Sequence, residues 1–229
     1  MATGLRRAAT TDGSSQVERA YRSIKAGIIE GRYPGGAALS EVALATEHGM
    51  SRTPIREGLS RLWTEHYLDR VAGHGYFVAR LTVESIRDTF DVRRLLEGAA
   101  AARAALLATD EQIAQLRTLA AFPMLPDAYR QAEAANARFH LAIAAAANNR
   151  LALELIERCL AQVDRFMSLG VTFGPISHGA SAAHLAIVEA IAAREPEAAQ
   201  QRMEEHLDCG SRGMKAALLD ISTPAIGLP

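Results

Sequence analysis

The segment from Ser51 to Trp63 constrains the fold of this chain more than any other part of its 229 residues. Ser51 suits the N-cap position, because its hydroxyl can accept a hydrogen bond from a free N–H group of a first helical turn. Pro54 suits that first turn, where its missing N–H costs little. Three aliphatic residues then follow at helical spacing: Ile55, Leu59 and Leu62. The segment therefore predicts a short amphipathic helix that buries this apolar side.

The polar residues of the same segment gather near its beginning. Arg52 and Arg56, with the hydroxyl groups of Ser51 and Thr53, lie where a helix N-terminus favours anions. In a DNA major groove, arginine reads guanine edges or holds phosphates. We therefore expect these four residues to contact double-stranded DNA. The alternative is a solvated surface helix that binds nothing.

Two further helices are expected before this one. Residues 17–29 carry apolar side chains at helical spacing, and glycine follows them. Leu39 and Ser40 open a second, short helix with Ser40 as its cap, and Gly49 follows its end. Two short helices separated by a tight glycine turn, the second of which carries arginines, make a helix-turn-helix.

A β-hairpin is expected after the arginine-bearing helix. Residues 67–71 and 76–80 are two short runs that flank a Gly-x-Gly turn. Next to a helix-turn-helix, such a hairpin is a wing. His74 lies at its tip between two glycines, where it would reach a minor groove or a phosphate. The alternative is an exposed turn histidine without a partner.

Residues 49–59 read GMSRTPIREGL, which resembles the GVSRTPVREAL pattern in the winged-helix domain of GntR-family transcription regulators. The resemblance covers about residues 17–80 and implies that Arg52, Arg56 and Arg61 contact DNA. Gly58 stands where the pattern has a helix-forming residue. A glycine there is expected to weaken the helix by roughly 1 kcal/mol relative to alanine.

Charge divides the chain near residue 80. Residues 1–80 hold 11 Lys and Arg against 8 Asp and Glu, a net charge of +3, whereas the remainder holds 14 against 18, a net charge of −4. A basic first third fits an anion-binding domain joined to a second domain. We expect four segments: a disordered arm at 1–15, the winged helix at 16–80, a second domain at 81–220 and a C-terminal tail at 221–229.

Composition argues against several other classes of protein. The two cysteines, Cys159 and Cys209, make no disulfide framework and have no metal-type spacing. No apolar run approaches the length of a membrane span. We therefore expect a soluble, cytoplasmic protein that has no membrane partner.

The residues after 80 predict an all-α domain. Short breaks separate six helical patterns, which cover residues 83–107, 110–121, 126–147, 150–169, 179–194 and 196–218. Six helices joined by short turns form an antiparallel bundle. The expected fold is therefore mainly α: a winged helix-turn-helix of three helices and a β-hairpin wing, joined to a six-helix antiparallel bundle.

Three histidines of this bundle have apolar neighbours on their own helix faces: His140, His184 and His206. His184 and His206 are equally far from a turn at Glu195, so an antiparallel hairpin sets them at about the same height. Asn136 lies four residues before His140 and shares its face. Three imidazoles and an amide oxygen suit zinc, nickel or another divalent transition metal. The alternative is a set of separately satisfied core histidines.

The same positions extend the resemblance to the FCD-type effector domain of the FadR branch, and six helices rather than seven are similar to its VanR-like subgroup. In metal-binding members of this branch an Asp and three His hold the ion. The three histidines fall on the family's histidine positions, whereas Asn136 falls where the family usually has Asp. An uncharged amide there implies a lower metal affinity or a different preferred metal.

The resemblance also implies a binding site for a small organic acid, since the ion in these domains commonly leaves coordination positions open. Arg93, four residues before Glu97, resembles the family's cavity-facing arginine and would clamp the carboxylate of such an effector. The alternative is a structural ion pair between Arg93 and Glu97 or Asp91.

The leading interpretation is a homodimeric, ligand-responsive transcription regulator, of repressor type, that binds a palindromic operator and is not an enzyme. Its effector would shift the relative placement of the two DNA-binding domains. A competing interpretation is a metal-dependent hydrolase or lyase. The sequence argues against it, because no general base is evident near the histidines and Asn136 replaces the one carboxylate that would serve. A third interpretation is a dimerisation module that binds no ligand.

Overall fold

The computed structural model describes residues 13–121, 129–168 and 180–222. The chain divides into two compact units, Met1–Arg80 and Leu81–Pro229. In the described ranges it forms nine helices and three short strands. The expected mainly α fold, with a winged helix-turn-helix before an all-α bundle, is therefore confirmed.

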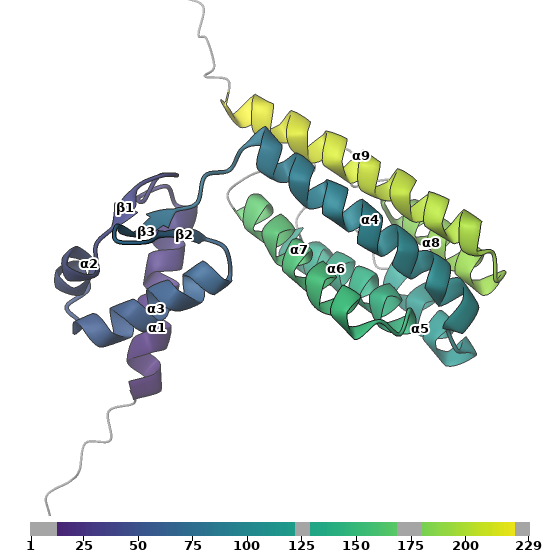
Figure 1. Cartoon of the computed structure of the whole chain (residues 1–229), viewed down its shortest axis with the longest axis horizontal. Helices are drawn as coiled ribbons and strands as arrows, with labels where there is room; N and C mark the ends of the chain where they lie inside the picture. The colour runs from purple at the N-terminus through teal and green to yellow at the C-terminus, as the bar shows by residue number, and fades with distance from the viewer. Residues whose placement is uncertain (1–12, 122–128, 169–179, 223–229) are drawn as a thin grey trace, which may run out of the picture. The chain divides into compact units, whose positions relative to one another are not determined.

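The first unit is a winged helix-turn-helix (Figure 1). Its elements are, in chain order, α1 (Gly13–Ile29), β1 (Ala38–Leu39), α2 (Glu41–Glu47), α3 (Arg52–Thr64), β2 (Leu68–Val71) and β3 (Gly75–Val78). Strand β3 is central in the sheet and pairs antiparallel with β1 on one side and with β2 on the other. Helices α2 and α3 form the helix-turn-helix, and the β2–β3 hairpin is the wing.

Three local expectations for this unit need correction. Helix α1 begins at Gly13, inside the segment expected to be a disordered arm, and the residues before it lie outside the described part. Leu39 belongs to β1 rather than to a helix, because it pairs with Tyr76 of β3. Ser51 occupies the N-cap of α3 with extended backbone, but its hydroxyl makes no capping hydrogen bond. The Ser40 hydroxyl does cap α2, as expected.

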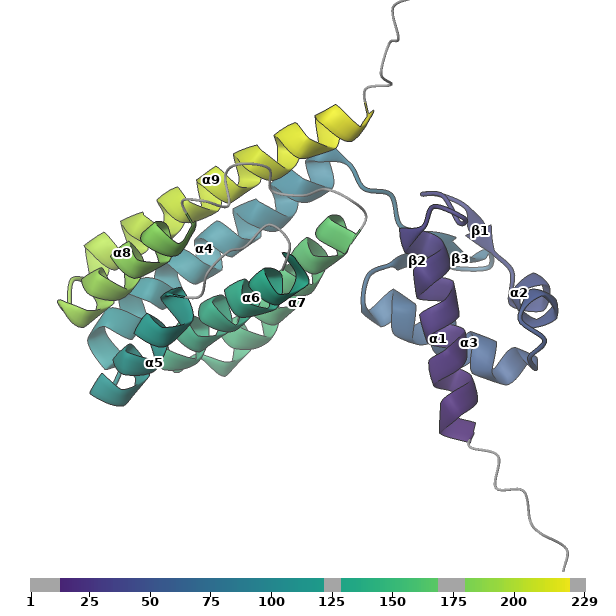
Figure 2. The ribbon, with the colours of Figure 1, turned by 180° about the vertical axis from the view of Figure 1, so that it is seen from behind.

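Gly58 lies on the buried side of α3, where this helix packs against α1 (Figure 2). A Cβ atom at Gly58 would lie 3.1 Å from the backbone nitrogen of Tyr21 and 3.5 Å from the carbonyl carbon of Ala20. These are backbone atoms of α1, which cannot swing aside as a side chain does. The missing Cβ therefore permits a close helix approach that offsets the weak helix propensity of glycine. The aliphatic side chains around it are fully or almost fully buried: Ile24, Ile28, Ile55, Leu59 and Leu62.

Replacing Gly58 with alanine is expected to destabilise the first unit by about 1 kcal/mol. Alanine gains about 1 kcal/mol in helix propensity, but overpacking against backbone typically costs about 1–3 kcal/mol. Urea unfolding, followed by the fluorescence of the single tryptophan, Trp63 in α3, measures the change. Ser60→Ala, at an exposed position of the same helix, is the control and should stay within about 0.5 kcal/mol. A more stable Gly58→Ala protein would contradict the close-packing explanation.

The second unit is an all-α bundle. Its helices are α4 (Val83–Leu107), α5 (Asp110–Ala120), α6 (Tyr129–Ala146), α7 (Arg150–Ser168), α8 (Ala180–Ala192) and α9 (Pro196–Ser222). The two longest, α4 and α9, lie side by side, and α6 lies beside α7 (Figures 1 and 2). All six correspond to expected helices, and α9 continues to Ser222, into the segment expected to be a tail. No helix in the described ranges combines the length and apolar composition needed to cross a lipid bilayer.

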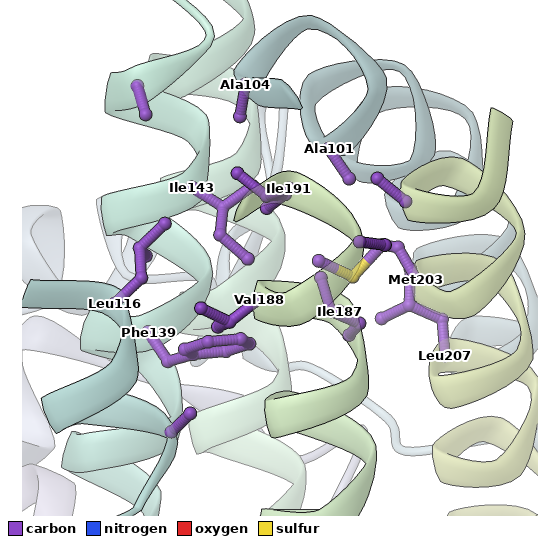
Figure 3. Close-up of a cluster of buried hydrophobic side chains, with 14 of the residues drawn as sticks. Ala101, Ala104, Leu116, Phe139, Ile143, Ile187, Val188, Ile191, Met203 and Leu207 are labelled. Atoms are coloured by element: carbon purple, nitrogen blue, oxygen red, sulfur yellow. The ribbon is translucent and has the colours of Figure 1, made fainter. Parts of the chain in front are cut away.

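The core of the second unit determines which side of each histidine-bearing helix faces the interior. Figure 3 shows the side chains that meet between these helices. The labelled residues are Ala101, Ala104, Leu116, Phe139, Ile143, Ile187, Val188, Ile191, Met203 and Leu207. Each histidine lies on its helix beside members of this cluster: His140 next to Phe139, His184 one turn before Val188, and His206 next to Leu207. Burial of the cluster therefore turns the histidines toward the interior.

Candidate DNA interface and metal centre

The beginning of α3 presents polar groups to solvent. Ser51, Arg52, Thr53 and Arg56 are exposed, whereas the intervening Pro54 and the aliphatic residues of the helix are buried. The four residues expected to contact DNA therefore lie together on the first two turns of the recognition helix. This is the end of the helix at which backbone N–H groups favour phosphate.

One carboxylate organises the two arginines. The Nε of Arg56 lies 3.0 Å from Oε1 of Glu41, and its Nη2 lies 2.9 Å from Oε2. The Nη2 of Arg52 lies 3.3 Å from the same Oε2. Hydrogen bonds from Arg56 and then Arg52 hold the pKa of Glu41 below its usual range, in spite of its partial burial. Sequence reasoning missed this role of Glu41. Its position directly after the N-cap residue Ser40 was the available sequence signal, because it places a carboxylate at the start of α2.

Arg61 is held on the other side of α3. Its Nη1 lies 2.8 Å from Oε2 of Glu18, and its Nε lies 3.0 Å from Oε1 of Glu65. The guanidinium carbon lies 3.7 Å from the ring centroid of Tyr21. These contacts fasten α3 to α1. They favour a structural role over the DNA contact that the resemblance implies for Arg61.

The wing carries His74 at its tip, as the sequence predicted. Gly73 and Gly75 have φ values of +75° and +90°, a region in which a side chain is strained and glycine is not. His74 is exposed, and its Nδ1 lies 3.1 Å from the carbonyl oxygen of Ala72. Its contact with DNA stays a prediction.

The structure brings the three predicted histidines together from three helices. His140 lies on α6, His184 on α8 and His206 on α9. The Nε2 atoms of His184 and His206 are 3.2 Å apart, and those of His206 and His140 are 3.3 Å apart. Phe139 supports the cluster by stacking on the His184 ring, with 4.1 Å between the ring centroids.

These distances suit nitrogen ligands of a single ion. Imidazole nitrogens bound to zinc at about 2.0–2.1 Å in a tetrahedral arrangement lie about 3.3–3.4 Å from one another. The two Nε2 separations of 3.2 and 3.3 Å are close to this edge length, and the ligand atoms of all three histidines lie within 4.8 Å of one another. The residues present therefore fit a divalent transition metal.

The histidines are neutral and so ready to act as ligands. Burial, with smaller contributions from the charges of His140 and Arg93, lowers the pKa of His184 to about 2. Burial is likewise the main reason that the pKa of His206 lies well below its usual range. Burial also lowers the pKa of His140, although the neighbouring Glu97 carboxylate acts in the opposite direction. A neutral imidazole need not lose a proton before it binds a metal.

Glu97 and Arg93 form a buried ion pair beside the cluster. The Nε of Arg93 lies 2.6 Å from Oε1 of Glu97, and Oε2 of Glu97 lies 2.5 Å from Nδ1 of His140. Burial by itself would raise the pKa of Glu97, but Arg93 and His140 outweigh it and hold that pKa at about 2. Of the two roles considered for Arg93, the ion pair with Glu97 is thus present.

Asn136 lies half-buried one turn before His140, next to a second buried carboxylate. Its amide donates a hydrogen bond to Glu133. Burial raises the pKa of Glu133, although the charge of Arg93 and this hydrogen bond act in the opposite direction. Sequence reasoning found no general base near the histidines, whereas the structure brings the Glu97 carboxylate into contact with His140. Glu133 precedes His140 by two turns of the same helix, and this spacing was the sequence signal for a second carboxyl group on α6.

A winged helix with exposed arginines at the start of its recognition helix, joined to a second all-α domain, defines a DNA-binding transcription regulator. The chain belongs to the GntR family of bacterial regulatory proteins. The model for this family matches residues 16–78, and the model for the FCD domain matches residues 88–208. The FCD domain supports the FadR-type branch of the family.

Individual relatives agree with this assignment. The Nta operon transcriptional regulator of Aminobacter aminovorans is 42% identical over 82 residues, which are 36% of this chain and 39% of that protein. The transcriptional repressor RspR of Escherichia coli K12 is 25% identical over 197 residues, which are 83% of this chain and 85% of that protein. A crystal structure of a GntR-family regulator from Pseudomonas syringae covers 92% of this chain and 89% of its own, with a TM-score of 0.55 and 24% identity. This last likeness concerns the fold alone.

Proposed function

We propose that this chain is a ligand-responsive repressor that binds a palindromic operator as a homodimer and senses a small organic acid at a metal-assisted site. The observation that carries the proposal is the convergence of three histidine Nε2 atoms in the FCD domain of a winged-helix regulator. The DNA-binding domain and the ligand site would lie in separate domains. This arrangement suits a cytoplasmic protein that couples the concentration of a metabolite to transcription. The six helices found in the described residues of the effector domain support the VanR-like subgroup.

His140, His184 and His206 would hold the ion, and Asn136 would be a fourth ligand through its amide oxygen. Imidazole and amide donors suit zinc or nickel. A bound ion supplies a positively charged Lewis acid that attracts a carboxylate. Because none of these four ligands is anionic, the ion would keep its full charge, which favours an anionic effector.

Arg93 is the residue of this chain that would strengthen binding of a carboxylate. Its charge lowers the pKa of His140, His184 and His206, so it acts on the whole cluster. Its Nε and Nη2 atoms face Glu97. An effector would therefore meet the remaining guanidinium donors and the positive charge rather than displace the ion pair.

A screen of small mono- and dicarboxylates tests the function directly. We expect at least one acid to raise the Tm of the zinc- or nickel-loaded protein and to change its affinity for an operator duplex about 5–150-fold. The operator is obtained first by selection from random duplexes, and a palindromic consensus is expected. If no acid alters either the Tm or operator affinity, the proposed effector class is wrong.

A solvent-exposed apolar surface supports the homodimer. The exposed large apolar residues of the neighbouring helices α4 and α7 are together called the leucine surface: Val92, Leu95, Leu106, Leu107, Leu151 and Leu155. Leu95 is 72% exposed and Leu106 is 65% exposed, although both are large aliphatic side chains. Exposed apolar patches on otherwise polar surfaces mark interaction sites. A second copy of the chain would bury this surface and present two winged helices to the two halves of an operator.

Substitution of both Leu95 and Leu106 by glutamate is expected to convert the dimer to a monomer. Four carboxylates brought into one isologous interface would be desolvated and would repel one another. Analytical ultracentrifugation measures the change in mass. Leu219→Glu, at an exposed leucine of α9 outside the leucine surface, is the control and should remain dimeric. A double variant that stays dimeric would place the interface elsewhere.

A further inference from the structure

We propose that Glu97 fixes the ring of His140 as a metal ligand and that Arg93 holds Glu97 in place, an inference that rests on the proposed metal centre. Glu97 would not touch the ion. It is a positioning residue that acts through His140. The buried ion pair of α4 would thus help to orient a ligand of the proposed metal site.

A continuous row of short contacts leads from α4 to the point where the histidines converge. Arg93 Nε lies 2.6 Å from Glu97 Oε1, and Glu97 Oε2 lies 2.5 Å from His140 Nδ1. On the far side of the same ring, His140 Nε2 faces His206 Nε2 at 3.3 Å. The side chains of Arg93, Glu97 and His140 are at most 3% exposed, so water does not compete for these contacts.

The contact at Nδ1 selects the form of the imidazole that can bind a metal through Nε2. A neutral imidazole carries one N–H group, on either Nδ1 or Nε2. A carboxylate accepts a hydrogen bond but cannot donate one, so Glu97 favours the proton on Nδ1 of His140. The Nε2 lone pair is then free and directed at the cluster. A carboxylate in this position also fixes the ring orientation and raises the basicity of the ligand.

Arg93 explains how a carboxylate is retained in this position. A buried, ionised carboxyl group is costly unless a charged partner and hydrogen bonds compensate it. Arg93 and Glu97 lie one helical turn apart on α4, so both reach the same side of that helix. The ring of Phe90, with its centroid 5.0 Å from the guanidinium carbon, packs against Arg93. Glu97 is thereby held between Arg93 and His140.

Glu97→Gln tests this role, because it keeps the size of the side chain and removes its charge. We expect zinc affinity, measured by competition with a chromophoric chelator, to fall about 10–100-fold. In the metal-free protein, the ¹⁵N resonances of His140 should change from a single Nδ1–H tautomer to a mixture. Glu189→Gln is the control, since it removes the carboxylate of another arginine–glutamate pair of this unit, with Arg117. It should leave zinc affinity unchanged.

Glu97→Asp is a second variant that keeps the charge and withdraws the carboxylate by one methylene. It decides the question if Glu97→Gln does not fold, and its zinc affinity should also fall. A folded Gln or Asp variant with zinc affinity within about threefold of the parent, well short of the loss expected for an orienting partner, overturns the proposal. If the parent itself binds no zinc, the metal centre fails, and this role of Glu97 fails with it. The two failures are therefore distinct.

Discussion

Replacing His206 with alanine is expected to abolish stoichiometric zinc binding and to leave the fold intact. The parent should bind about one zinc per chain, and the variant should bind it more than about 100-fold more weakly, since even an orienting partner of a ligand contributes 10–100-fold. His206 is the middle residue of the cluster, because its Nε2 lies 3.2 Å from that of His184 and 3.3 Å from that of His140. It is also the least buried of the three, so its truncation leaves the smallest cavity.

Metal content after dialysis against zinc, measured by mass spectrometry, decides this prediction. Bound zinc at a free concentration of a hundred times Kd should stabilise the parent by about 2.7 kcal/mol, and the variant should lose this stabilisation. His48→Ala removes a histidine of the first unit, outside the cluster, and should retain the metal. A His206→Ala protein that keeps one zinc per chain would show that the three histidines do not form the metal site.

The helices were predictable because their signals are local. Apolar spacing, capping residues and Gly or Pro breaks located the nine helices of the described ranges, and a glycine turn located the wing. Strand β1 was not predictable, since it has only two residues, which are a strand because they pair with Phe77 and Tyr76 of β3. The hydroxyl of Ser51 illustrates a different limit. Its sequence context fixes the N-cap position, but the capping hydrogen bond depends on the side-chain rotamer.

The candidate sites were predictable only in part, for a related reason. A histidine among apolar neighbours on one helix face points inward, so the three imidazoles could be expected to meet. The partner of a charged residue can lie on another helix, and the spacing of residues along one helix does not predict which residue that partner is. Glu97 was recognised as a neighbour of Arg93, but its contact with His140 depends on how α4 packs against α6. In the same way, Glu41 meets Arg56 only after α2 has packed against α3.

Replacing Arg56 with alanine is expected to weaken operator binding by about 1–3 kcal/mol, or about 5–150-fold, if the guanidinium reads a base. The contact of Arg56 with Glu41 uses Nε and Nη2, and the exposed side chain has further N–H donors for a guanine edge. Fluorescence anisotropy with the selected operator duplex, at several salt concentrations, measures the effect. A base contact changes affinity mainly for the operator. A phosphate contact weakens binding to all sequences and reduces the salt slope by about one.

The Arg61→Ala variant distinguishes a DNA-contacting role of Arg61 from a structural role within the first unit. Because Arg61 joins Glu18, Glu65 and the ring of Tyr21, its loss should lower the stability of the first unit, and operator affinity of the folded variant should stay near that of the parent. Arg52→Ala should resemble Arg56→Ala, since both guanidiniums share Glu41. If the Arg52 and Arg56 variants both bind as tightly as the parent at every salt concentration, DNA is not read by the start of α3. A large operator-specific loss for Arg61→Ala would instead mean that its contacts with α1 give way when DNA binds.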